Sequence, residues 1–200
     1  MGVARHHWLG ALCFQPERNN FMPTIKRDET EKIFSGIAGE YFVAGELSRR
    51  GYIAAVTLRN TAGVDIVASN ESEAVNIQVK TRTVEKTDNS WQMGSKPLTV
   101  KKEHEKTFYV FVAVHSNPQK QDIEYYIVPK NLLNEKVEGR CLDFLKKSKK
   151  TKQTVERCKR VFWLEKELPE LKKLKDRWDV IFAKNPMALA QEIIGENRVT

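Results

Sequence analysis

Apolar and polar positions follow two different periods along the chain, and these periods predict its helices and strands. Residues 33–50 have a helical period, and one arc of this predicted helix carries Ile33, Ile37, Ala44 and Leu47. Gly51 is expected to end it. Residues 52–58 predict a strand, and residues 64–70 and 74–82 predict a hairpin closed by a polar turn.

The second half of the chain predicts two more strands and then helices. Residues 107–115 and 123–129 are apolar enough to lie in the centre of a sheet. Residues 83–106 are polar and predict a loop with a short helix over 100–106. A helix is expected to begin near Asn131, helical spacing continues over 164–181, and Asn185 with Pro186 predicts a last helix start.

Two carboxylates interrupt this apolar pattern. Glu40 falls in the middle of the apolar arc of the first helix, and Asp65 lies in a strand that is otherwise apolar on both faces. A carboxylate in such a place is costly unless it has a partner, so we expect a cation between the two. Gln78 and Lys80 share one face of the next strand, and a short hairpin would set them beside Asp65.

These residues have the chemistry of a metal site. The carboxylates of Glu40 and Asp65, the amide oxygen of Gln78 and the backbone carbonyl of Val79 form a hard oxygen donor set suited to Mg²⁺, for which Mn²⁺ can substitute. Lys80 would stand beside the attacking water or the scissile phosphate. Each residue also has a structural interpretation: a polar residue on an alternating strand, a loop-bonded Asp65, or a Glu40–Lys80 ion pair.

The order and spacing of these residues resemble the PD-(D/E)XK nuclease superfamily. Asp65 matches the motif aspartate, Gln78-Val79-Lys80 matches the (D/E)XK tripeptide, and Glu40 is similar to the helical glutamate of archaeal Holliday-junction resolvases. The resemblance covers about residues 33–130, and several segments are also similar to an uncharacterised bacterial family within this superfamily. It implies a restriction-endonuclease-like αβββαβ core with a mixed sheet, and Mg²⁺-dependent endonuclease cleavage of DNA.

The chain departs from the superfamily pattern at Gln78, where an acid is usual. A neutral ligand lowers the negative charge of the site and weakens metal binding. A second interpretation is therefore a nuclease-fold DNA-binding module without turnover, and a third is an interaction protein without a nucleic-acid partner. The expected helix between the third and fourth strands of the superfamily core also has a poor pattern here.

Charge adds a candidate surface for DNA. The net charge is +8, and residues 140–177 alone hold 14 Lys and Arg against 6 Asp and Glu. Such a segment is typical of polyanion binding, although a solvated lysine-rich surface is the alternative. We expect phosphate contacts from the following residues: Arg82, Lys146, Lys147, Lys149, Lys150 and Lys152.

The remaining expectations concern organisation and location. We expect an N-terminal extension over 1–27 that is poorly ordered, a nuclease-like core over 28–138, and a basic helical region over 139–200 that packs on the core. Three dispersed cysteines favour a reducing cytoplasm, and no apolar run is long enough to predict a membrane span. DNA is the expected partner, and a homodimer is left open.

Overall fold

The computed structural model describes residues 29–58, 63–84, 90–93, 106–115, 117, 119, 122–147, 161–163 and 168–195. These residues form an α/β fold around a five-stranded mixed sheet of order β1-β2-β3-β5-β6. Its strands are β1 (Ile53–Val56), β2 (Ile66–Ser69), β3 (Ala74–Val84), β5 (Thr107–His115) and β6 (Ile123–Pro129). Strand β3 runs parallel to β5, and the other neighbours are antiparallel. The predicted α/β class and the predicted hairpin are confirmed.

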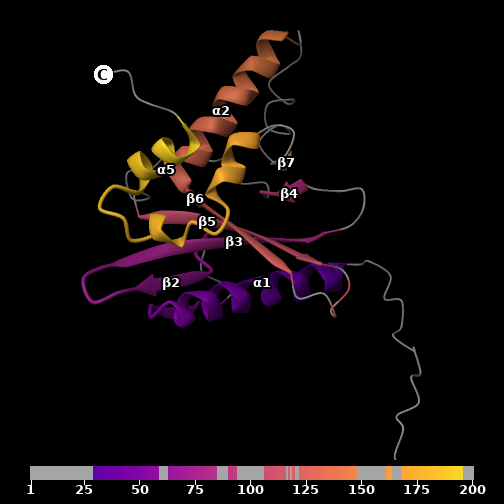
Figure 1. Ribbon diagram of the computed structural model, residues 1–200. Coiled ribbons are helices and arrows are strands. Elements are labelled where there is room, and N and C mark those ends of the chain that lie inside the picture. Colours follow the sequence, from indigo (N-terminus) through magenta and orange to yellow (C-terminus); the bar gives the residue numbers. More distant parts are fainter. Residues whose placement is uncertain are drawn as a thin grey trace, which may run out of the picture.

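Helix α1 (Glu29–Arg49) lies on one side of the sheet and packs mainly on β3 and β1, whereas α2 (Lys130–Lys147) and α5 (Pro186–Ile194) gather on the other side (Figure 1). The predicted apolar arc is confirmed in part: Ala44 and Leu47 are buried, whereas Ile33 is 46% exposed, and Val43 outside the arc also enters the core. Gly51 has a φ of 86° and follows the helix. This left-handed conformation favours glycine, so the predicted helix end is confirmed.

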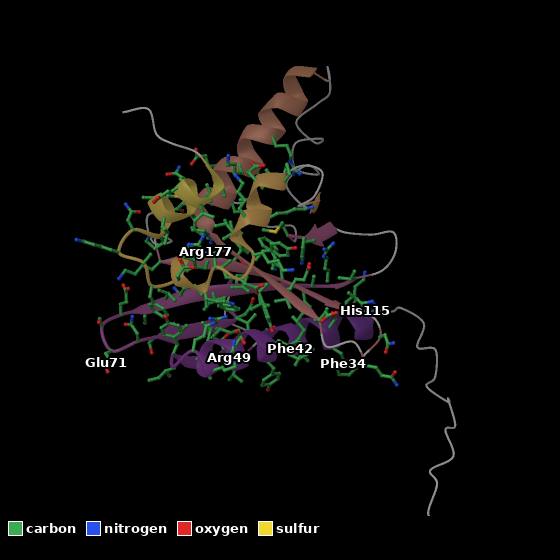
Figure 2. The ribbon with its side chains drawn as sticks, in the orientation of Figure 1. Phe34, Phe42, Arg49, Glu71, His115 and Arg177 are labelled. Atoms are coloured by element: carbon green, nitrogen blue, oxygen red, sulfur yellow. The ribbon has the colours of Figure 1, made fainter. Side chains whose placement is uncertain are left out.

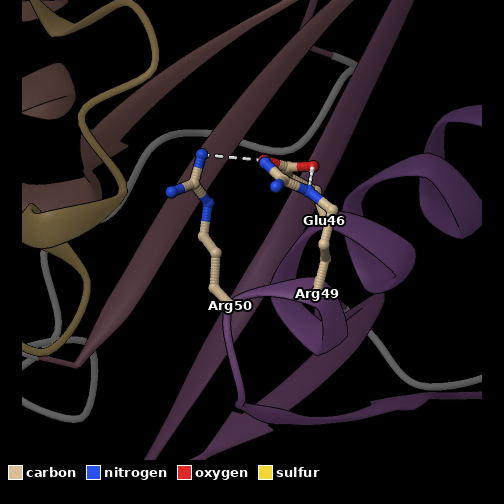
Figure 3. A network of polar contacts seen from close by, with 3 residues as sticks. All are labelled: Glu46, Arg49 and Arg50. Carbon is tan, nitrogen blue, oxygen red and sulfur yellow. Dashed lines mark hydrogen bonds and ion pairs between the residues drawn. The ribbon is translucent and has the colours of Figure 1, made fainter.

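The end of α1 is fixed by an ion-pair network. Glu46 accepts hydrogen bonds from Arg49 at 2.8 Å and from Arg50 at 2.7 Å (Figure 3). The hydrogen bond from Arg49 is the largest cause that lowers the pKa of the Glu46 carboxyl. The Arg50 guanidinium carbon also lies 5.3 Å from the centre of the Trp178 ring. The C-terminal part of the chain is thereby joined to α1.

Close packing between α1 and β3 depends on Gly39. A Cβ atom at Gly39 would collide with the side chain of Thr81 on β3. We expect Gly39→Ala to lower the free energy of unfolding by about 1–3 kcal/mol, because a packed core resists added volume. Gly36→Ala is the matched control, since a Cβ there meets nothing within 4 Å and gains about 0.5–1 kcal/mol of helix propensity. Urea denaturation of both variants measures the difference, and equal effects would contradict this packing account.

The C-terminal region differs from the sequence prediction. Helical spacing was predicted over 164–181, and the structure has two 3₁₀ helices there, η2 (Pro169–Leu174) and η3 (Trp178–Val180), instead of α-helix. The spacing of three between Leu168, Leu171 and Leu174 fits three residues per turn equally well. The last helix was predicted correctly: the Asn185 side chain accepts a hydrogen bond from the Ala188 N–H, and Pro186 opens α5.

Two further predictions concern residues around the core. The region 83–106 was predicted as a loop, yet β3 extends to Val84, and β4 (Ser90–Gln92) pairs with β7 (Val161–Trp163). The short helix over 100–106, the extension over 1–27 and residues 149–152 fall outside the described ranges, apart from Lys106 in a turn.

Helix α2 begins one residue before the predicted start and runs across position 139, the predicted start of the C-terminal region. Within the described ranges, no helix has the length and hydropathy that a membrane span needs.

Candidate metal centre

Asp65 lies immediately before β2, at the point where the pairing of β2 with β3 stops. Its carboxylate Oδ2 accepts a hydrogen bond of 2.7 Å from the backbone N–H of Val79. Its own backbone N–H donates to the carbonyl of Ile77, and its carbonyl accepts from the N–H of Thr57, each at 2.9 Å. Asp65 is therefore held between β1 and β3, and its carboxylate takes the place of a main-chain acceptor at the end of the ladder.

Lys80 is the cation that this carboxylate attracts. Burial lowers the pKa of the half-buried Lys80 below its ordinary 10.5, and the negative charge of Asp65 offsets part of that shift. The net lowering means that the desolvation of Lys80 outweighs its attraction to Asp65. A lysine with a lowered pKa beside a carboxylate is typical of functional sites, although structural ion pairs also show such shifts.

Gln78 and Val79 complete the part of the site that β3 provides. Gln78 is half-buried and alternates onto the same face as Lys80. Val79 is 8% exposed and points its side chain into the core on the opposite face. In an extended strand the N–H and C=O of one residue point the same way, so the Val79 carbonyl faces the Asp65 side of β3. The backbone of Val79 therefore contacts Asp65, whereas the expected position of the Gln78 amide beside Asp65 stays a prediction.

Tyr109 is a neighbour that the sequence did not single out. It lies directly beside Gln78 in the parallel pairing of β3 with β5. Burial, and then the negative charge of Asp65, raise the pKa of Tyr109 to about 12. The phenol therefore stays protonated into alkaline pH and can donate a hydrogen bond near the site. The sequence does not distinguish Tyr109 from a core residue, because a tyrosine in an apolar strand usually packs in the core.

Glu40 reaches β3 from the side of α1. It is half-buried and follows Gly39, which touches Thr81. Strand alternation turns Thr81 towards α1 and Lys80 towards the other face, where Phe111 is its neighbour on β5. The contacts described here bring Asp65, Val79 and Lys80 together. The participation of Glu40 in the same site stays a prediction.

Arg82 occupies a buried position instead of an open surface. It is 9% exposed, and its guanidinium carbon lies 3.9 Å from the centre of the Trp91 ring. Trp91 in turn packs edge-on against Phe111 and Tyr126. Arg82 lies two residues after Lys80 on the same face of β3, so this stack packs on that face at Arg82. Contact between Arg82 and DNA stays a prediction, and in this conformation the side chain packs within the protein.

The basic C-terminal segment is only partly described. Lys146 and Lys147 lie in the last turn of α2, and Lys149, Lys150 and Lys152 belong to residues that the structure leaves out. Other cations of the segment serve the fold: Lys175 pairs with Glu124 and Arg177 with Asp179, both at 2.7 Å. DNA contact by the five lysines remains a prediction.

The donor set can be tested against the chemistry of Mg²⁺. No group of three or more His, Cys, Asp or Glu side chains that could hold a metal occurs in the described part of the chain. The predicted set differs from such a group, because it has two carboxylates, one amide oxygen and one carbonyl. A carboxylate has about four lone-pair sites, so Asp65 can accept the Val79 N–H and also contact a cation. The oxygen-only set fits a hard cation.

Comparison with known proteins gives no independent assignment. No family model, no curated protein and no solved structure matches this chain. The functional argument therefore rests on the site itself.

Proposed function

We propose that this protein is a Mg²⁺-dependent endonuclease that hydrolyses phosphodiester bonds in DNA. The observation that carries the proposal is the Asp65 carboxylate, which accepts the Val79 N–H and lies beside Lys80, a half-buried lysine of lowered pKa. The element order supports a restriction-endonuclease-like core: one helix, three antiparallel strands, and then a strand parallel to the third.

Each residue has a distinct role in the proposed reaction. Asp65, the Gln78 amide and the Val79 carbonyl would hold the cation, with Glu40 as a further ligand. Mg²⁺, when bound, supplies charge stabilisation at the phosphoryl oxygens. Lys80 orients the attacking water by hydrogen bonding and stabilises the charge that develops on the phosphate. Water adds across one P–O bond, which leaves a phosphomonoester and a sugar hydroxyl.

DNA cleavage with an Asp65 variant tests the proposal. Supercoiled, nicked, linear and branched DNA are each incubated with wild type or Asp65→Asn in Mg²⁺, Mn²⁺ or excess chelator. The variant keeps an oxygen that accepts the Val79 N–H, so it removes the charge and preserves the hydrogen bond. We expect metal-dependent cleavage that falls about 10³-fold in the variant, because metal stabilisation contributes several kcal/mol. Equal rates, or salt-sensitive binding without cleavage, would contradict the proposal.

A further inference from the structure

The face of α1 that points away from the sheet is apolar and exposed. Phe34 and Tyr41 are each 64% exposed, and Phe42 beside them is 40% exposed. Phe34 and Phe42 are labelled along this helix in Figure 2. Between Lys32 and Glu46 the helix has one charged residue, Glu40, and that residue belongs to the buried arc. Surface helices normally carry charge on the outer face, so this face has the character of an interface.

The outer face of α1 has the residue spacing of a helix–helix interface, and we call this row of residues the seam. Phe34, Ala38, Tyr41 and Gly45 follow one another at spacings of four, three and four, which is the spacing of a coiled-coil seam. Large and small residues alternate along it. A spacing of four, three, four also reads the same in both directions.

This alternation makes the seam complementary to its own reverse. When two copies of α1 pack antiparallel about a two-fold axis midway between positions 38 and 41, Phe34 lies opposite Gly45 and Ala38 lies opposite Tyr41. Each layer then joins one large and one small residue, as close helix packing requires. Parallel packing would instead set Phe34 against Phe34 and Ala38 against Ala38, which leaves clashes and gaps.

Charge favours the same arrangement. The helix sequence has Glu29 and Glu31 in its first turn and ends at Arg49, which Arg50 follows. An antiparallel pair sets the acidic end of one helix beside the basic end of the other, and it also opposes the two helix dipoles favourably.

We propose that a second copy of this chain covers this face, through an antiparallel, two-fold α1–α1 contact centred between Ala38 and Tyr41. The interface is isologous, as in most homodimers. One helix pair buries less than the roughly 800 Å² per partner of a standard interface, so the expected dissociation constant is micromolar. The proposal does not depend on the nuclease assignment, since Glu40 and the β3 residues face the other way.

Sedimentation velocity over a dilution series that spans the micromolar range measures the association. We expect Tyr41→Lys to weaken it at least about 30-fold, because a central aromatic is lost and like charges meet at the axis. The control is Leu58→Lys, since Leu58 is 85% exposed and lies beyond β1. This substitution should change the dissociation constant of the dimer by less than about threefold. A chain that stays monomeric, or a dimer lost in Leu58→Lys and kept in Tyr41→Lys, overturns the proposal.

Disulfide trapping checks the direction of the helices. In a background with Cys13, Cys141 and Cys158 changed to serine, Ala38→Cys lies near the axis and should cross-link to its own copy. Ser48→Cys should not, because antiparallel packing separates its two copies by about 25 Å along the helix at about 1.5 Å per residue. Equal cross-linking at both positions would mean parallel helices, and no cross-linking at position 38 would place the contact elsewhere; either result overturns the proposal.

Discussion

Lys80→Met is expected to abolish DNA cleavage while it leaves the fold as stable as before or more stable. Burial lowers the pKa of Lys80 despite the attraction of Asp65, so the charged lysine is a cost to the native state. Methionine keeps the length and removes that cost. Cleavage should fall about 10²–10³-fold, as when a charge-stabilising group is lost, and the free energy of unfolding should rise by up to about 1 kcal/mol.

The matched control for this prediction is Lys106→Met. Lys106 is exposed and pairs with Glu73 at 2.6 Å, so it is also a lysine with a carboxylate partner. Its loss should change stability by less than about 1 kcal/mol and should leave cleavage unchanged. A loss of more than about 2 kcal/mol in Lys80→Met would instead identify Lys80 and Asp65 as a structural ion pair.

The pH dependence of stability gives the same prediction a second readout. Between the lowered native pKa of Lys80 and its ordinary value of 10.5, the unfolded chain binds more protons than the native protein. The contribution of Lys80 to the free energy of unfolding therefore rises with pH between these two pKa values. Denaturation curves recorded across alkaline pH should show this rise in wild type relative to Lys80→Met, and parallel curves would contradict the lowered pKa.

Gln78→Glu is expected to strengthen both metal binding and cleavage. A second carboxylate on β3 raises the negative charge of the donor set, and cation affinity should rise about 10-fold or more with it. Without metal, the new carboxylate repels Asp65, so we expect lower stability that Mg²⁺ restores. Mg²⁺ dependence of the cleavage rate and of thermal unfolding measures the two effects.

Asn76→Asp is the control for Gln78→Glu. Asn76 is also half-buried, and it lies two residues earlier on the same face of β3. The substitution adds the same charge outside the site and should leave the Mg²⁺ dependence unchanged. Equal gains in the two variants would mean that general electrostatics, and not a ligand at position 78, controls cation binding.

Features that are local in sequence were predictable. Glu40 and Asp65 were identified because a carboxylate in an apolar pattern needs a partner, and the structure gives Asp65 the Val79 N–H. That bond itself could not be predicted, since it depends on where the β2–β3 ladder ends. Tyr109 was missed because its proximity to the site comes from β3–β5 pairing across a long connection.

Elements that depend on distant pairing were also missed. Trp91 was assigned to a loop because β4 is three residues long and pairs with β7, far along the chain. The spacing of the C-terminal leucines predicted a helical segment but not its type, because it fits both helix types, and Asp176, with φ of 55°, separates the two 3₁₀ helices that form. Tertiary contacts, and not local period, decide both cases.

A calorimetric titration of Mn²⁺ into wild type and Asp65→Asn, without DNA, tests the central claim most directly. It needs no knowledge of the preferred substrate. The account predicts binding to wild type that weakens at least about 10-fold when the Asp65 charge is removed and the Val79 hydrogen bond is preserved. Absence of binding to wild type, or equal affinity in the two proteins, would contradict a metal centre at Asp65.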